Sequence, residues 1–179
     1  MTHKEVITEI CTELGKDDKT RFIGYNTVYG SRMYGTLKDV DKGRCVETPV
    51  CENLMMGLAM GMSLEGFRPV VCFERHDFLL IGLDAIVNHL DKMPMVSGYQ
   101  YKMPVIVRAI VGSKEPLDPG PQHTADYTSA LITMLKDTPV YVPRTEEGLR
   151  CAWKKAREGD SLSGASVIVE YRDNYTLQL

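Results

Sequence analysis

The sequence predicts an α/β domain in which a mostly parallel central sheet is covered by helices on both faces. Helical segments alternate along the chain with short runs rich in Val, Ile and Tyr, which is typical of parallel strands joined by crossover helices. The chain has 179 residues, 44% of them hydrophobic, enough to bury one core. No internal repeat, linker or low-complexity tract divides it. We therefore expect a single domain over residues 1–179.

The expected helices and strands follow one another in a regular order. They are a helix at Lys4–Leu14, a strand at Arg21–Asn26, a helix at Glu52–Leu64, a strand at Arg68–Glu74, a helix at Phe78–Met93, a strand at Pro104–Val111, a helix at Thr124–Leu135, a strand at Pro139–Pro143, a helix at Glu146–Arg157 and a strand at Ser166–Tyr171. Loops are expected at Tyr29–Gly43, where three glycines punctuate polar sequence, and at Ser113–Gln122, where three prolines forbid regular structure.

The charge and hydropathy patterns argue against nucleic-acid and membrane partners. The net charge is −3, and no run of Lys or Arg forms a basic patch. The polar start Met1–Glu5 lacks the apolar block of a signal peptide, and no later apolar run is long enough to span a bilayer. We expect a cytoplasmic protein that is neither exported nor anchored.

The cysteines point to the same compartment. Their number is odd and none forms a Cys-x-x-Cys pair, so we interpret them as buried thiols in a reducing cytoplasm. They are Cys11, Cys45, Cys51, Cys72 and Cys151.

Common nucleotide and metal motifs are missing from the sequence. There is no phosphate-binding Gly-x-x-x-x-Gly-Lys-Ser/Thr loop, no His-Glu-x-x-His and no calcium-loop spacing. The four histidines lack Cys or carboxylate neighbours at ligand spacing, so no metal site is expected among this chain's own residues.

Glu52 is the residue that most strongly indicates a function. It opens an almost wholly apolar helix, where a carboxylate faces packed protein. Burying it costs several kcal/mol unless it is protonated or finds a dedicated partner. One interpretation is a bound cofactor. The alternative is a helix N-terminal glutamate that serves the backbone and the helix dipole, worth about 0.3–1 kcal/mol.

An ordered set of motifs extends nearly from end to end of the chain. They are Glu47-Thr48-Pro49-Val50-Cys51-Glu52, Gly66-Phe67-Arg68-Pro69-Val70-Val71, Asp77-Phe78, Asp84-Ala85-Ile86-Val87-Asn88-His89, Ser97-Gly98, Val107-Arg108-Ala109, Gly120-Pro121-Gln122-His123 and Glu170-Tyr171-Arg172. In this order the chain resembles the pyrimidine-binding domain of thiamine-diphosphate enzymes, most closely the β subunit of 2-oxo-acid dehydrogenases.

The resemblance implies that Glu52 hydrogen-bonds a pyrimidine ring nitrogen of thiamine diphosphate and favours the imino tautomer that deprotonates the thiazolium. We expect an apolar wall of Leu54, Met55 and Leu58 to raise the pKa of Glu52 above about 4.3, so that a proton can be shared near neutral pH.

The resemblance assigns three further residues to the cofactor pocket. Phe78 is placed to stack on the pyrimidine, although a single phenylalanine is more often a core residue. Val50 and Glu74 are expected to line the same pocket. The stretch Phe73–Phe78 is more highly charged than is usual in the family.

His123 is the second expected catalytic residue. It follows a family-like Gly-Pro-Gln, and its position implies that it orients a 2-oxo acid or relays a proton, which suits an imidazole with a pKa of about 6.5. The alternative is that His123 helps to cap the following helix.

The departures from the family imply partners. The family binds the diphosphate and its magnesium through Gly-Asp-Gly on a separate domain, but here Gly159-Asp160 is followed by Ser161. The chain also ends just after its last strand, without a trace of the family's carboxyl-terminal domain. A diphosphate-binding, α-type subunit is therefore expected to bring Mg2+. Gly57 and Gly61, one helical turn apart, each cost about 1 kcal/mol relative to alanine and indicate close contact with a neighbouring helix, as where subunits of the family meet.

The expected activity is that of one subunit of a split thiamine-diphosphate enzyme, inactive alone, which decarboxylates a 2-oxo acid and transfers the acyl unit. Two alternatives stay open: a transketolase-like or carboligase transfer of a carbon unit to a sugar or aldehyde, and a non-catalytic assembly subunit.

Overall fold

Six parallel strands form a single sheet in the computed structural model, which describes all residues from Met1 to Leu179. Across the sheet the order is β2-β1-β3-β4-β6-β5, and every neighbouring pair is parallel. The strands are β1 (Thr20–Gly24), β2 (Cys45–Glu47), β3 (Arg68–Phe73), β4 (Ile106–Val111), β5 (Val140–Tyr141) and β6 (Ser166–Tyr171). The predicted fold class is confirmed.

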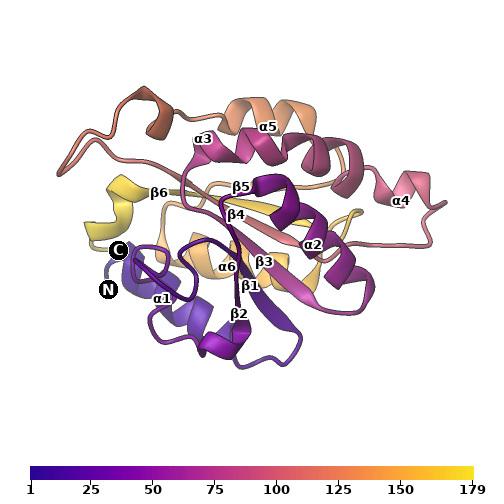
Figure 1. Cartoon of the computed structure of the whole chain (residues 1–179), viewed down its shortest axis with the longest axis horizontal. Helices are drawn as coiled ribbons and strands as arrows, with labels where there is room; N and C mark the ends of the chain where they lie inside the picture. Colours follow the sequence, from indigo (N-terminus) through magenta and orange to yellow (C-terminus); the bar gives the residue numbers. More distant parts are fainter.

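Helices cover both faces of this sheet (Figure 1). They are α1 (His3–Leu14), α2 (Glu52–Leu64), α3 (His76–Leu79), α4 (Met93–Val96), α5 (Thr128–Met134) and α6 (Glu146–Glu158). Helices α2, α3 and α5 lie on one face, and α1 and α6 lie on the other (Figure 1). Short 3-10 segments stand at Lys42–Arg44, Leu80–Gly82, Pro121–His123 and Arg172–Thr176.

Two hydrophobic cores result, one on each face of the sheet. On β3, Val71 packs into the core beneath α2, whereas its neighbour Val70 packs into the core beneath α1 and α6. Successive side chains of a strand point to opposite faces, so a strand buried on both faces is continuously apolar. This explains why β3, β4 and β6 are recognisable in the sequence as unbroken hydrophobic runs.

The ends of the helices follow from local side-chain chemistry. At α1, the Thr2 hydroxyl accepts a hydrogen bond from the Glu5 backbone N–H while the Glu5 carboxylate accepts one from the Thr2 N–H, which is a capping box. The Thr145 hydroxyl accepts in the same way from the Gly148 N–H at the start of α6. Helix α6 ends at Gly159, whose φ of +65° is left-handed and therefore favours glycine.

The helix expected at Phe78–Met93 is divided into shorter pieces. It comprises α3, the 3-10 segment, a π-helical stretch at Ala85–Leu90 and then α4. Pro94, the residue after the expected end of that helix, lies in the first turn of α4, where its missing N–H has no helical partner to lose.

Two further expectations differ from the structure. The three-residue strand β2 was not predicted, because it is too short and too exposed to show a hydrophobic run. The helix expected from Thr124 begins at Thr128, whose N–H donates a hydrogen bond to the Asp126 carboxylate at 2.9 Å.

The interpretation of all five cysteines as buried thiols is wrong. Cys11 and Cys72 are buried, but Cys45 is only half-buried, and Cys51 and Cys151 are exposed. Both exposed thiols lie at or on a helix that has one face in solvent, so their apolar neighbours in sequence do not enclose them.

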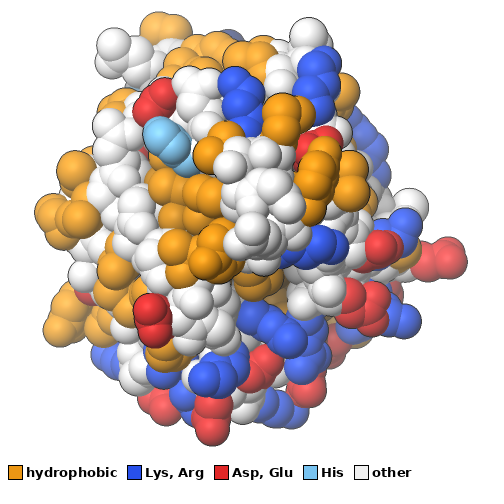
Figure 2. Space-filling view, turned by 90° about the vertical axis from the view of Figure 1, so that its right-hand side faces the viewer, with side chains coloured by type: hydrophobic (Ala, Val, Ile, Leu, Met, Phe, Trp, Pro, Cys, Tyr) orange, Lys and Arg blue, Asp and Glu red, His pale blue; other side chains and the backbone are white.

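The edge of the sheet at which the strands begin carries an exposed hydrophobic surface. Figure 2 shows hydrophobic side chains gathered on this side of the molecule, from which α4 projects. Met95, Val96, Tyr99 and Tyr101 contribute to it and are each at least half exposed. No helix has the length and apolar character needed to cross a membrane.

Candidate active site

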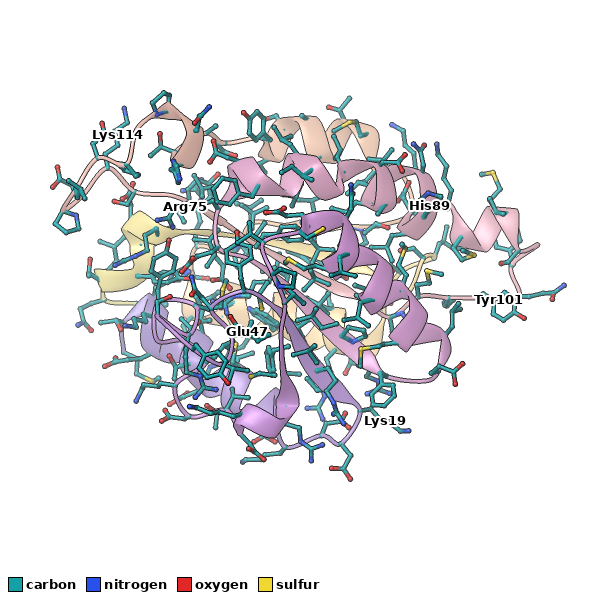
Figure 3. The ribbon with its side chains drawn as sticks, in the orientation of Figure 1. Lys19, Glu47, Arg75, His89, Tyr101 and Lys114 are labelled. Atoms are coloured by element: carbon teal, nitrogen blue, oxygen red, sulfur yellow. The ribbon has the colours of Figure 1, made fainter.

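The candidate site lies at the edge where the parallel strands end. In Figure 3, Lys19 and Tyr101, which precede β1 and β4, lie toward one side of the sheet. Glu47, Arg75 and Lys114, which end or follow β2, β3 and β4, lie toward the other side. Ligands of open α/β sheets bind outside the carboxyl ends of the strands, so the second edge is where a site is expected.

Glu52 is buried at this edge without a partner for one of its oxygens. It is the first residue of α2 and is only 2% exposed, and its Oε1 is buried without a hydrogen bond. A buried carboxylate oxygen without a donor is costly, so an external donor fits this position.

Tyr25 is a second buried group in the same place. Its hydroxyl is buried without a hydrogen-bond partner. Burial, followed by the negative charges of Glu52 and Glu74, raises the pKa of Tyr25 well above its usual value. Tyr25 therefore stays a neutral phenol close to both carboxylates.

The expected apolar wall around Glu52 is present only in part. Met55 is fully buried and Leu58 is partly buried against the core beneath α2. Leu54 is 48% exposed, because it lies on the outward side of the helix, so its inclusion in the wall was wrong.

Glu47 holds the backbone that follows β1. Its carboxylate accepts hydrogen bonds from the N–H groups of Asn26 (2.7 Å), Thr27 (3.0 Å) and Val28 (2.7 Å). Burial raises the pKa of Glu47, but these bonds outweigh it and hold the pKa below its usual value. The turn that carries Tyr25 into the site is thus fixed by an ionised carboxylate.

Glu74, expected to line the pocket, is held by the same turn. Its Oε2 accepts from the Asn26 side-chain amide and its Oε1 accepts from the Ser31 hydroxyl, both at 2.8 Å. These bonds direct the carboxylate toward the loop after β1. The negative charge of Glu74 acts on Tyr25, as does that of Glu52.

Phe78 and His123 contact each other at the next part of the edge. Their ring centroids are 5.3 Å apart and the rings meet edge to face, at 80°. The His123 Nδ1 is buried without a hydrogen-bond partner. Helix α5 begins only at Thr128 and has no side-chain cap, so the capping alternative for His123 does not hold.

The chain between His123 and α5 is fastened to α3. The Asp77 carboxylate accepts from the Ala125 N–H at 3.3 Å, and His76 Nδ1 accepts from the Tyr127 N–H at 3.2 Å. Burial lowers the pKa of His76, although nearby Asp126 opposes the shift, and a neutral imidazole is the form that can accept.

Val50, expected to line the pocket, is 68% exposed. The predicted residues therefore form two groups at one edge, Glu52 with Glu74 around Tyr25, and Phe78 with His123. Val50 stands on an open surface beside them.

Three residues of this edge were missed in the sequence. Glu47 belongs to a recognised motif, but nothing in the motif reveals that it binds the turn after β1. Tyr25 lies within the expected strand Arg21–Asn26, where nothing in the sequence marks it as a site residue. Arg75 was noted only as part of a charged stretch.

Comparison with known proteins agrees with this architecture. The pattern of the family described as the transketolase pyrimidine-binding domain matches residues 1–178. Among relatives, the β subunit of the pyruvate dehydrogenase E1 component of Rickettsia conorii is 32% identical over 143 residues, covering 76% of this chain and 43% of the relative. The mitochondrial counterpart of Saccharomyces cerevisiae is 31% identical over 162 residues, covering 87% of this chain and 43% of the relative. The chain thus spans less than half the length of the curated relatives that it matches.

Two solved structures share the fold. A split-gene transketolase described as an inactive β4 tetramer has a TM-score of 0.72 at 22% identity, covering 96% of this chain and 52% of that one. The transketolase of Campylobacter jejuni has a TM-score of 0.74 at 16% identity, covering 100% of this chain and 27% of that one. The fold, the motif order and the family match lead to one conclusion: this chain belongs to the transketolase pyrimidine-binding domain family.

Proposed function

We propose that this chain belongs to a subunit of a thiamine-diphosphate enzyme and supplies its pyrimidine pocket. The observation that carries the proposal is the buried Oε1 of Glu52, which has no donor within the chain. A ring nitrogen that shares or donates a proton would supply the hydrogen bond that this oxygen does not find within the chain.

The residues present fit such a cofactor. Glu52 would hold the aminopyrimidine by a shared proton, and Phe78, which is only partly buried, would offer a flat apolar face to the ring. Val50 and Glu74 would border the same pocket. When bound, thiamine diphosphate supplies a nucleophilic carbon and an electron sink for a bond next to a carbonyl.

Each residue of this chain then has a limited task. Glu52 holds and returns one proton at its free oxygen, while buried Met55 keeps water from the helix start. His123, whose Nδ1 has no partner, orients the substrate or passes a proton.

We propose that the reaction is decarboxylation of a 2-oxo acid with transfer of the acyl unit. The support is the sequence relationship to proteins named as β subunits of the pyruvate dehydrogenase E1 component. The polar, weakly acidic composition is compatible with action in the cytoplasm.

The proposal includes partners. The relatives' names describe β subunits, so an α-type subunit is proposed to complete the site, binding the diphosphate and Mg2+. Self-association is proposed through α2, where a side chain added at Gly57 or Gly61 would meet no atom of this chain within 4 Å. A related fold described as a β4 tetramer without activity agrees with both ideas.

The test is Glu52→Gln in the complex purified through a tag on this chain from cells that also produce its partner. Turnover of pyruvate, followed by carbon dioxide release, should fall at least about 100-fold, since general acid–base groups contribute about 10²–10⁴-fold. The matched control is Glu65→Gln, which changes an exposed glutamate at the other end of α2.

Co-purification of the partner should be unchanged in both variants. Equal turnover in wild type and Glu52→Gln would remove Glu52 from the mechanism. Transfer from a ketose without carbon dioxide release would replace the proposed reaction with a transketolase-like one, and the absence of any thiamine-diphosphate binding would leave an assembly role.

A further inference from the structure

Two guanidinium groups meet at the carboxyl-end edge without an acidic partner. Arg75, just after β3, and Arg172, just after β6, both lie over the ring of Tyr34, at 5.1 and 5.0 Å from its centroid. Neither forms an ion pair, whereas Arg108 and Arg150 each bind a carboxylate. The two guanidinium groups therefore lie close together at this edge, and no carboxylate of the chain forms an ion pair with either of them.

The hydrogen bonds of Arg75 leave one side of its guanidinium free. Nη1 donates to the Glu74 carbonyl oxygen at 3.1 Å. Nε is buried without an acceptor, and Nη2 donates no hydrogen bond within the chain. The Nε and Nη2 groups together form the fork that binds a carboxylate or phosphate through two parallel hydrogen bonds.

The nearby carboxylates do not fill this fork. Glu74 is engaged by Asn26 and Ser31 on the other side. The negative charge of Asp77 acts on Arg75, but no oxygen of Asp77 forms an ion pair with Arg75. The Asp77 Oδ1 accepts from the Ala125 N–H instead. A buried donor of a charged group without an acceptor is costly, which indicates a missing anion.

Gly112 brings Arg75 next to the proposed catalytic histidine. A Cβ added at Gly112 would clash with the His123 carbonyl oxygen and lie 3.4 Å from the Arg75 Cδ. The backbone of His123 and the stem of Arg75 thus rest on the same glycine, immediately after β4. In Figure 3, Arg75 lies at the base of the loop that carries Lys114.

We propose that Arg75 is a specificity-determining residue that binds the anionic group of the substrate beside His123, and that this group is the carboxylate of a 2-oxo acid. The inference rests on the proposed function and deepens it. A substrate phosphate offers the same oxyanion chemistry, and the experiment distinguishes the two sources.

The experiment compares wild type, Arg75→Gln and Arg75→Lys in the purified complex with its partner subunit. The kcat/KM values are measured with an artificial two-electron acceptor, which allows pyruvate to be converted to acetate and carbon dioxide and acetaldehyde, a neutral carbonyl compound of similar size, to be converted to acetate. A charged hydrogen bond is worth about 1.5–3 kcal/mol, so Arg75→Gln should lower kcat/KM for pyruvate about 10- to 100-fold, mainly through KM, and leave acetaldehyde unchanged. Arg75→Lys should recover only part, because an ammonium lacks the fork.

The matched control is Arg21→Gln, since Arg21 also lies over an aromatic ring, Phe67 at 5.0 Å, but at the opposite edge of the sheet. A purely structural role for Arg75 would affect pyruvate and acetaldehyde alike and would overturn the inference. If Arg75→Gln lowers kcat/KM for a ketose phosphate more than for the free ketose, the anion site is kept and is assigned to phosphate.

The two proposals fail differently. If Glu52→Gln abolishes turnover and Arg75→Gln leaves the pyruvate-to-acetaldehyde ratio unchanged, only the anion site is overturned. If Glu52→Gln has no effect, the proposed function itself is overturned. Calorimetric binding of thiamine diphosphate to Arg75→Gln, expected at wild-type affinity, verifies that the variant is folded.

Discussion

Arg108 on β4 and Glu170 on β6 form a fully buried ion pair with two parallel hydrogen bonds. Nε donates to Oε1 at 2.9 Å and Nη2 donates to Oε2 at 2.8 Å. The Tyr175 hydroxyl also donates to Glu170, at 2.6 Å, and so fastens the segment after β6 to the sheet. His3 stacks on Tyr175 with ring centroids 6.5 Å apart, which joins the first helix to the same cluster.

Removing one partner of this pair should destabilise the chain strongly. Glu170→Ala leaves a buried guanidinium without a counter-ion, so the free energy of unfolding should fall by about 3–5 kcal/mol. Replacing both partners, as Arg108→Met with Glu170→Leu, should cost less, because no charge is then left uncompensated. Urea unfolding of the three proteins measures this. A double variant that is less stable than Glu170→Ala would contradict the argument.

Glu47 should make the turn after β1 sensitive to acid. Its folded pKa is lowered by the N–H groups that it accepts from, so its stabilisation is present above its unfolded pKa of about 4.3 and is lost as the pH falls through the lower folded value. Glu47→Gln should lower the free energy of unfolding by about 1–3 kcal/mol at pH 7. The difference from wild type should shrink below pH 4.

The control for Glu47 is Glu13→Gln, since Glu13 pairs with Lys16 on the exposed surface of α1. Such a solvent-exposed pair contributes little to stability, so this variant should unfold nearly like wild type. A constant difference between Glu47→Gln and wild type from pH 7 to pH 3 would show that its ionisation is not involved.

Much of the fold is readable from the sequence because most strands are buried on both faces. The bounds predicted for Ser166–Tyr171 are those of β6, a strand covered above and below. Strand β2 could not be predicted from the sequence because it has only three residues and all of them are half-buried. The helix after β3 was predicted as one piece, since hydrophobic spacing does not reveal a π-helical stretch at Ala85–Leu90.

The candidate site was predictable only where one residue sufficed. A carboxylate at the start of an apolar helix singles out Glu52 without any structure. The neighbourhood of Arg75, Gly112 and His123 depends on parallel strands ending at a common edge, which spacing along the chain does not reveal. The exposure of Leu54 likewise depends on which side of α2 faces solvent, and that of Val50 on the path of the chain before α2.

The thiols should differ sharply in reactivity. Burial raises the pKa of Cys11 to about 12 and raises that of Cys72 further, so neither forms a thiolate near neutral pH. Cys51 and Cys151 are exposed. Iodoacetamide at pH 8, read by mass spectrometry of peptides, should label the two exposed thiols first. Labelling of Cys72 at a similar rate would contradict the described core.

Cys51 precedes Glu52, so its labelling also reports on the proposed site. In the complex with thiamine diphosphate and the partner subunit, Cys51 should be protected while Cys151, on α6 across the sheet, stays reactive. Equal labelling of Cys51 in the free chain and in the complex would place the partner elsewhere.

Gly112 should tolerate no side chain. A Cβ there would clash with the His123 carbonyl oxygen, and that oxygen belongs to the backbone, which cannot move aside without displacing the histidine. Gly112→Ala should cost about 1–3 kcal/mol of stability and lower turnover of the complex. Thermal unfolding and kcat together test this. An unchanged kcat in this variant would show that the reaction does not depend on the position of His123.

Replacing Gly57 or Gly61 by alanine should stabilise the free chain, in contrast to Gly112→Ala. A Cβ at Gly61 meets no atom within 4 Å, so Gly61→Ala should raise the stability of the free chain by up to about 1 kcal/mol, the difference in helix propensity. If α2 packs closely against a helix of another subunit, the added methyl group obstructs that contact and weakens assembly. Sedimentation velocity over a concentration series measures the association, and urea unfolding at low concentration measures the stability. A variant that gains stability and still assembles like wild type would exclude α2 as the contact, because a helix pair held by glycines cannot accept side chains without moving apart.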